Sequence, residues 1–182
     1  METTKWALDP THSEIQFKVK HLLISTVTGH FKQFNATIET VGEDLSTAKV
    51  HLTADLSSIS TNNEQRDAHL RSTDFFDAET HPQLTFEGTS LEQVDEENYK
   101  AHGTLTIRGN SKPITLNVEL GGKTVDPWGN TRLGFEVSGK INRMDYGVSF
   151  GMPSETGAAL LGEEVKIQAN AEFVKQAELQ VA

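Results

Sequence analysis

Apolar residues recur at every second position through most of this chain, and this period constrains the fold more than any other feature. The alternation is clear in Ile15, Phe17 and Val19, which are separated by polar side chains. Successive side chains of a β-strand point to opposite faces, so such a run predicts a strand with one buried and one hydrated face. This pattern is typical of antiparallel sheets.

About eight strands are expected. They comprise a segment at 29–40 and seven alternating sets: Ile15, Phe17 and Val19; Ala48, Val50, Leu52, Ala54 and Leu56; Leu84 and Phe86; Ala101, Gly103, Leu105 and Ile107; Ile114, Leu116, Val118 and Leu120; Leu133, Phe135, Val137, Gly139 and Ile141; Val165, Ile167, Ala169, Ala171 and Phe173. A strand over 131–143 would extend roughly 40 Å at ~3.4 Å per residue, which indicates an elongated antiparallel barrel. The 182 residues are interpreted as one all-β domain, 1–182.

One short helix is expected near 62–71. Thr61 and Glu64 match the capping box S/T-x-x-E, and Arg71 in the last turn suits the helix dipole. The helix carries little apolar surface, so it must lean on neighbouring structure, and the pair Phe75–Phe76 is the expected anchor.

Composition excludes several classes of protein. The formal net charge of −10 argues against nucleic-acid binding and against an anionic membrane surface. The absence of cysteine excludes disulfides and thiolate chemistry. No uncharged stretch approaches the ~18 residues of a membrane span, so stable membrane insertion is not expected. The first ten residues lack the features of a signal peptide, which predicts a cytoplasmic protein, or a periplasmic one if Met1 replaces a removed signal.

Motifs for catalysis and metal binding are weak. Gly147 to Gly151 match G-x-S-x-G, but a nucleophile elbow requires a following helix, and none is expected there. The seven histidines form no metal-binding spacing, so no metal or other cofactor is predicted. The pairs Arg66–Asp67 and Arg143–Asp145 could act as acid–base groups, although we favour a structural role.

An eight-stranded barrel either fills its interior with side chains or holds one ligand, and periodicity alone does not separate the two. In a closed barrel the alternating faces would lie inside. The residues expected to face a ligand are Ile15, Phe17, Val19, Phe31, Val50, Leu52, Leu70, Phe75, Phe76, Leu105, Ile107, Leu116, Val118, Phe135, Val137, Arg143, Val165 and Ile167. The 62–76 insert is expected to cover part of the wall or one mouth, with Leu70, Phe75 and Phe76 at the ligand or its access path. The alternative is that Phe75 and Phe76 fill the core.

The order of several landmarks resembles the YceI-like, polyisoprenoid-binding family over about residues 5–174. The landmarks are Trp6 with Asp9 and His12–Ser13; Gly29, Phe31 and Phe34; Ser58–Ile59, Thr61, Arg66–Asp67, His69–Leu70 and Asp74–Phe75–Phe76; Pro82 with Phe86; Arg108–Gly109 with Lys112–Pro113; Asn142–Arg143 with Asp145 and Gly147; and Gly162 with Glu164–Val165. Ser60 and Asn35 depart from the family pattern, which has Asp and Gly there.

The resemblance implies a lipocalin-like barrel that holds a long apolar chain, such as a polyisoprenoid, a prenylated quinone or a fatty-acyl compound. It also implies a possible homodimer. Three functions remain open: non-catalytic binding for carriage, storage or sensing, which we favour; an enzyme acting on such a lipid, with Arg143, Asp67 or His21 as candidate groups; and an interaction or stress-response protein whose cavity is incidental.

Overall fold

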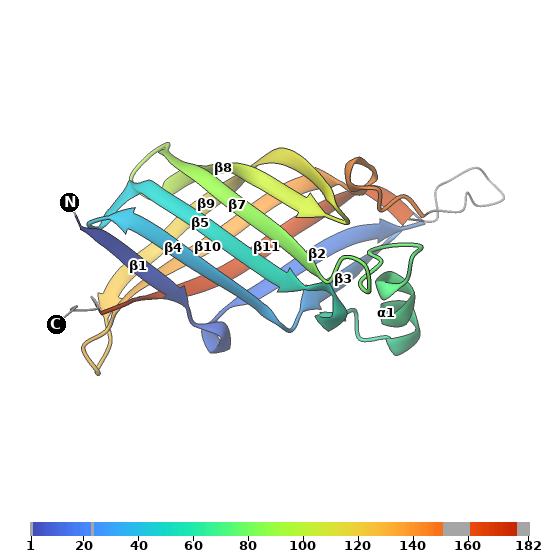
Figure 1. Ribbon diagram of the computed structural model, residues 1–182, viewed down its shortest axis with the longest axis horizontal. Coiled ribbons are helices and arrows are strands. Elements are labelled where there is room, and N and C mark those ends of the chain that lie inside the picture. The colour runs from blue at the N-terminus through green and yellow to red at the C-terminus, as the bar shows by residue number, and fades with distance from the viewer. Residues whose placement is uncertain (1, 23, 151–160, 178–182) are drawn as a thin grey trace.

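The computed structural model describes residues 2–22, 24–150 and 161–177, and most of them lie in β-strands (Figure 1). The strands are β1 (Thr3–Leu8), β2 (Glu14–His21), β3 (Ser25–Phe31), β4 (Phe34–Val41), β5 (Asp44–Asp55), β6 (Ile59–Ser60), β7 (Gln83–Gln93), β8 (Asn98–Ile107), β9 (Asn110–Val125), β10 (Thr131–Asn142) and β11 (Leu161–Lys175). The helical elements are α1 (Glu64–Arg71) and the 3₁₀ turns η1 (Pro10–His12), η2 (Leu56–Ser58) and η3 (Arg143–Tyr146).

The strands form a closed, eight-stranded antiparallel barrel, as the alternation predicted. Around the ring the order is β1, β4, β5, β7, β8, β9, β10 and β11, and pairing of β1 with β11 closes it. The barrel is elongated, with α1 at one end and both termini at the other (Figure 1). No helix in the described part of the chain is long and apolar enough to cross a membrane.

The first strand of the barrel was not predicted. β1 and β2 lie end to end along β11, and η1 separates them. Pro10 has no backbone N–H to donate to a sheet, and the Asp9 side chain accepts a hydrogen bond from the Thr11 backbone N–H. The predicted 29–40 strand is likewise two strands, β3 and β4, because the chain turns at Lys32–Gln33.

The predicted start of the helix was wrong. α1 begins at Glu64, and its N-cap is Asn63, whose side chain accepts from the Arg66 backbone N–H at 3.0 Å. Asn62 has a positive φ of 61°, a conformation that asparagine tolerates, and this places Asn63 at the cap. The Thr61 hydroxyl instead donates to the Asp67 carboxylate at 2.6 Å.

Large buried side chains pack together in the half of the barrel near the termini. Trp6 is 1% exposed, and its indole Nε1 donates to the Thr40 hydroxyl at 3.1 Å. Tyr99 and Leu133 belong to the same buried cluster. These three side chains therefore fill part of the interior at this end of the barrel.

Candidate functional site

An apolar cavity of about 240 Å³ lies inside the barrel. Each strand of the closed ring contributes to its wall, for example Leu8 of β1, Leu105 of β8 and Phe135 of β10. On β11 the lining residues run from Leu161 to Phe173, roughly 40 Å of strand at ~3.3 Å per residue. The cavity therefore follows the length of the barrel, which suits an extended chain better than a compact molecule.

All eighteen residues expected to face a ligand border this cavity. The alternating faces of β2, β5, β8, β9, β10 and β11 contribute most of them, and Leu70, Phe75 and Phe76 reach it from the insert. The structure brings these positions together around one space. Whether they bind a ligand stays a prediction.

Other lining residues were not among the predicted site residues. Ala36 and Ile38 of β4 alternate in the same way as Phe34, so that strand offered a usable signal. Tyr146, Val148 and Leu161 lie in or beside η3 and at the start of β11, where no periodicity marks them. Only the fold brings these last three to the cavity.

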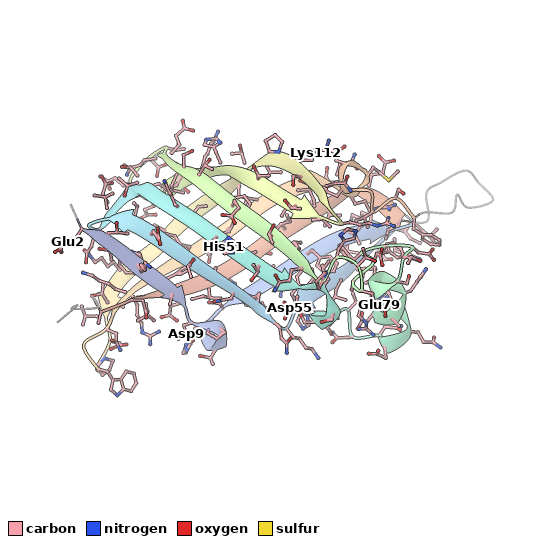
Figure 2. All side chains as sticks on the ribbon, viewed as in Figure 1. Glu2, Asp9, His51, Asp55, Glu79 and Lys112 are labelled. Carbon is pink, nitrogen blue, oxygen red and sulfur yellow. The ribbon has the colours of Figure 1, made fainter. Side chains whose placement is uncertain are left out.

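The outside of the barrel carries the polar halves of the alternation. Figure 2 shows polar side chains spread over this surface, and His51 and Lys112 among them are exposed. The cavity, in contrast to this polar exterior, has an almost entirely apolar wall.

The insert is held to the barrel by an aromatic cluster. The ring of Phe75 lies 4.9 Å from that of His69 and 5.1 Å from that of Phe150, centroid to centroid. The His69 ring also meets Phe150 edge-on at 4.9 Å. Phe75 is buried and Phe76 is half-buried, so the two neighbours differ in how much of the core they fill.

The polar groups weighed as catalytic are occupied by structural contacts. Asp67 accepts from the backbone N–H and the hydroxyl of Thr61, and Arg66 donates to the hydroxyl and carbonyl of Thr61. Arg143 donates to four backbone carbonyls at 2.7–3.1 Å. These contacts agree with the structural role favoured from the sequence.

Two further polar residues that bear on catalysis are Tyr146 and Ser149. Tyr146 is 1% exposed and borders the cavity, and burial together with the charge of Asp145 raises its pKa to about 12. Ser149, within the G-x-S-x-G match, is exposed and follows η3 rather than a strand, whereas a nucleophile elbow begins from a strand. Gly151 lies outside the described residues.

One cluster among the described residues could in principle hold a metal: Asp9, His12 and Glu172. The guanidinium of Arg132 already lies 2.9 Å from Asp9 Oδ2 and 3.7 Å from Glu172 Oε1. A cation would compete with this side chain for the same oxygens. The cluster is therefore interpreted as an ion-pair network that joins η1 to β10 and β11.

Known proteins match the chain over nearly its whole length. The family model of the YceI-like domain matches residues 6–173. A UPF0312 protein of Staphylococcus epidermidis is 43% identical over 171 residues, which covers 93% of this chain and 97% of that protein.

Solved structures agree in fold. A Campylobacter jejuni YceI protein is 35% identical, with a TM-score of 0.71 over 87% of this chain and 90% of that one. A domain from Saccharophagus degradans, described as polyisoprenoid-binding and implicated in plant cell wall breakdown, is 19% identical, with a TM-score of 0.71 over 94% and 98% of the two chains.

Proposed function

The chain belongs to the YceI-like domain family, and from this premise we propose that it binds one long-chain apolar ligand inside the barrel without catalysing a reaction. The main observation in support is the long apolar cavity, whose wall contains residues from every strand of the closed ring. Polyisoprenoids, prenylated quinones and fatty-acyl compounds fit this chemistry. The Saccharophagus degradans domain described as polyisoprenoid-binding supports the same ligand class.

The free energy of transfer from water favours the binding of such a ligand. Transfer of about twenty carbons from water at ~0.8 kcal/mol per CH₂ amounts to a gross ~16 kcal/mol. Loss of translational freedom and ordering of the chain cancel much of this, yet the remainder supports tight binding with few polar contacts. Shape and length would then select the ligand, since a hydrophobic pocket discriminates one methylene by only ~1–3 kcal/mol.

A non-catalytic role is supported by the state of the polar groups. Asp67 and Arg143 form hydrogen bonds within the fold, and Arg143 is the single charged residue among the described residues that line the cavity. Carriage, storage and sensing all require only reversible binding. The possible homodimer and the cytoplasmic location stay predictions, which light scattering and cell fractionation would test.

Native mass spectrometry before and after organic extraction tests the proposal. We expect a co-purified lipid mass, and uptake of prenyl or acyl probes by the extracted protein. Val137→Phe, which adds bulk to the cavity wall, should reduce uptake. Val125→Phe is the matched control, because Val125 is 63% exposed. Uptake that is absent from the folded wild type, or unchanged by Val137→Phe, would argue against binding in the barrel.

A further inference from the structure

Several exposed lysines lie together on the outer face of the barrel, where β10, β11 and β2 are neighbours (Figure 1). Lys140 of β10 is the register partner of Lys166 of β11, and Lys166 is in turn the partner of Lys18 of β2. Lys20 lies two residues farther along β2, on the same face as Lys18. Neighbouring strands are ~4.8 Å apart, so three lysines form one row across the sheet. The name lysine patch is used below for Lys18, Lys20, Lys140 and Lys166.

The charge of the lysine patch is only partly compensated. Its one ion pair among the described residues joins Lys140 Nζ to Glu164 Oε1 at 3.9 Å. Within three residues of the patch along the chain, the acidic residues are Glu163 and Glu164, so four positive charges face two negative ones. Like charges directly opposite one another on paired strands destabilise a sheet. An anionic surface next to the patch would remove this repulsion.

An exposed apolar residue lies in the turn that follows the patch on β2. Ile24 stands between β2 and β3 and is 84% exposed, and its backbone N–H donates to His21 O at 3.1 Å. Leu22 in the same turn has a positive φ of 51°, a conformation that leucine rarely adopts. Such positions in hairpin turns normally carry Gly, Asn or Asp. This turn instead presents an apolar side chain to solvent.

The turn lies at the α1 end of the barrel, next to one end of the cavity (Figure 1). His21 is the register partner of Leu161, which borders the cavity. Phe17 and Val19 border the cavity from the inner face of β2, so the lysines that alternate with them point outward. The patch and the turn are therefore the outer surface of a wall whose inner surface lines the cavity.

We infer that Ile24 and the lysine patch together dock the protein reversibly on a membrane that contains anionic lipids. This rests on the proposed function, because a carrier of a membrane lipid must meet the bilayer that supplies or receives the lipid. Peripheral proteins bind such surfaces by burying apolar side chains at the boundary of the acyl chains, while lysines attract the anionic head groups. A soluble polyanion would neutralise the lysines but would offer no apolar phase for Ile24.

Composition alone predicts the opposite behaviour. The formal net charge of −10 opposes association with an anionic surface at long range. Salt screens exposed charges that are more than ~10 Å apart, so at contact the charges of the docked face matter most. The strand register places four lysines on that face, although acidic residues outnumber lysine and arginine by 26 to 16 in the whole chain.

Vesicle flotation tests the inference with the wild-type protein. Vesicles of phosphatidylcholine alone are compared with vesicles of phosphatidylcholine and phosphatidylglycerol in equal parts, at low and at high salt. At low salt we expect at least about tenfold tighter binding to the mixed vesicles, and we expect salt to weaken it. Equal binding to the two kinds of vesicle, or binding to neither, would overturn the inference.

Uptake of prenyl or acyl probes from solution, measured without vesicles, separates this inference from the proposed function. Uptake by a protein that does not bind the mixed vesicles would leave the proposed function standing and overturn the docking. Vesicle binding by a folded protein that takes up no probe would contradict the proposed function alone.

Paired substitutions test the lysine patch. Lys18→Gln combined with Lys166→Gln should weaken binding to the mixed vesicles at least about tenfold, since each lysine near an anionic surface contributes about fivefold. Lys49→Gln combined with Lys100→Gln makes the same change in net charge at exposed positions of β5 and β8, and should have little effect. Equal losses in the two double variants would show that net charge, and not the patch, governs binding.

A second pair tests the apolar turn. Ile24→Ser should weaken binding to the mixed vesicles several-fold at both salt concentrations, because the apolar contribution is not screened. Val94→Ser is the matched control, since Val94 is 58% exposed in the turn between β7 and β8, away from α1 (Figure 1). Binding that Ile24→Ser leaves unchanged would remove Ile24 from the docking surface.

Discussion

Gly29 lies directly against the ring of Phe17 on the paired strand. The two residues are partners in the β2–β3 register, and a Cβ built at position 29 would lie 2.2 Å from Phe17 Cζ. Because Gly29 has no side chain, the phenyl group of Phe17 can occupy this space, where it borders the cavity. Phe31 packs beside it at a centroid distance of 5.7 Å.

Gly29→Ala should therefore destabilise the protein. The Phe17 ring would have to move, and overpacking of this kind typically costs ~1–3 kcal/mol. The midpoint of urea unfolding measures the loss. Gly134→Ala is the matched control within a strand, because nothing lies within 4 Å of its added Cβ. Equal midpoints for the two variants would show that Phe17 has free space to move into.

Phe75 and Phe76 should respond differently to truncation. Phe75 is 6% exposed and packs against His69 and Phe150, so Phe75→Ala should cost ~3–5 kcal/mol of unfolding free energy. Phe76 is only half-buried, so Phe76→Ala should cost less and should speed ligand dissociation. Urea unfolding and stopped-flow probe release measure the two effects. A strongly destabilised Phe76→Ala with unchanged release would instead identify Phe76 as core.

Thr40→Val should destabilise the buried cluster around Trp6. The Thr40 hydroxyl accepts from Trp6 Nε1 at 3.1 Å and donates to Gly42 O at 2.6 Å. Valine has the same shape but leaves the buried indole N–H without this partner, at a cost of ~1–3 kcal/mol. Thr37→Val, at an exposed position of the same strand, is the control.

The fluorescence of Trp6 can report the unfolding of the Thr40→Val variant. The chain has two tryptophans, and Trp128 is 80% exposed, so a Trp128→Phe background leaves Trp6 as the only indole signal. An unfolding midpoint that Thr40→Val does not lower would mean that Trp6 finds another acceptor.

Asp9 should make stability depend on acidic pH. Hydrogen bonds from Thr11, His12 and Arg132 hold the pKa of its carboxyl well below the usual value of about 3.9. A carboxyl with a lower pKa in the folded chain stabilises the fold above the unfolded value, and loses this contribution as pH falls from about 4 toward the folded value.

Asp9→Asn is thus expected to be less stable than the wild type at neutral pH, and to lose less stability between about pH 4 and pH 2. Urea midpoints across this range give the comparison. Glu79→Gln, an exposed change beside α1 and away from Asp9, should keep the wild-type pH dependence. Parallel curves for Asp9→Asn and the wild type would exclude Asp9 as a source of acid sensitivity.

Strand positions that pack regularly were predictable. Ile15, Phe17 and Val19 alternate with polar residues without interruption, and in the closed barrel their shared face points inward. The pleat of a strand places alternate side chains on the same face, so all three face the interior together once that face is buried. The helix was predictable in type but not in its start. Thr61 and Asn63 both suit an N-cap, and the partner that the fold offers Thr61, the buried Asp67, decides between them.

Local sequence by itself thus determined the all-β class, the strand faces and the short helix, because periodicity and capping act between residues close in the chain. The tertiary structure alone decided that β1 closes the ring, that Trp6 fills one end, and that Arg143 is buried among the carbonyls of Val148, Phe150, Leu161 and Gly162. These contacts join segments that are distant in the chain and that no local sequence pattern relates to one another. Barrel closure brings them together, since only then does the energy of burial act on residues distant in the chain.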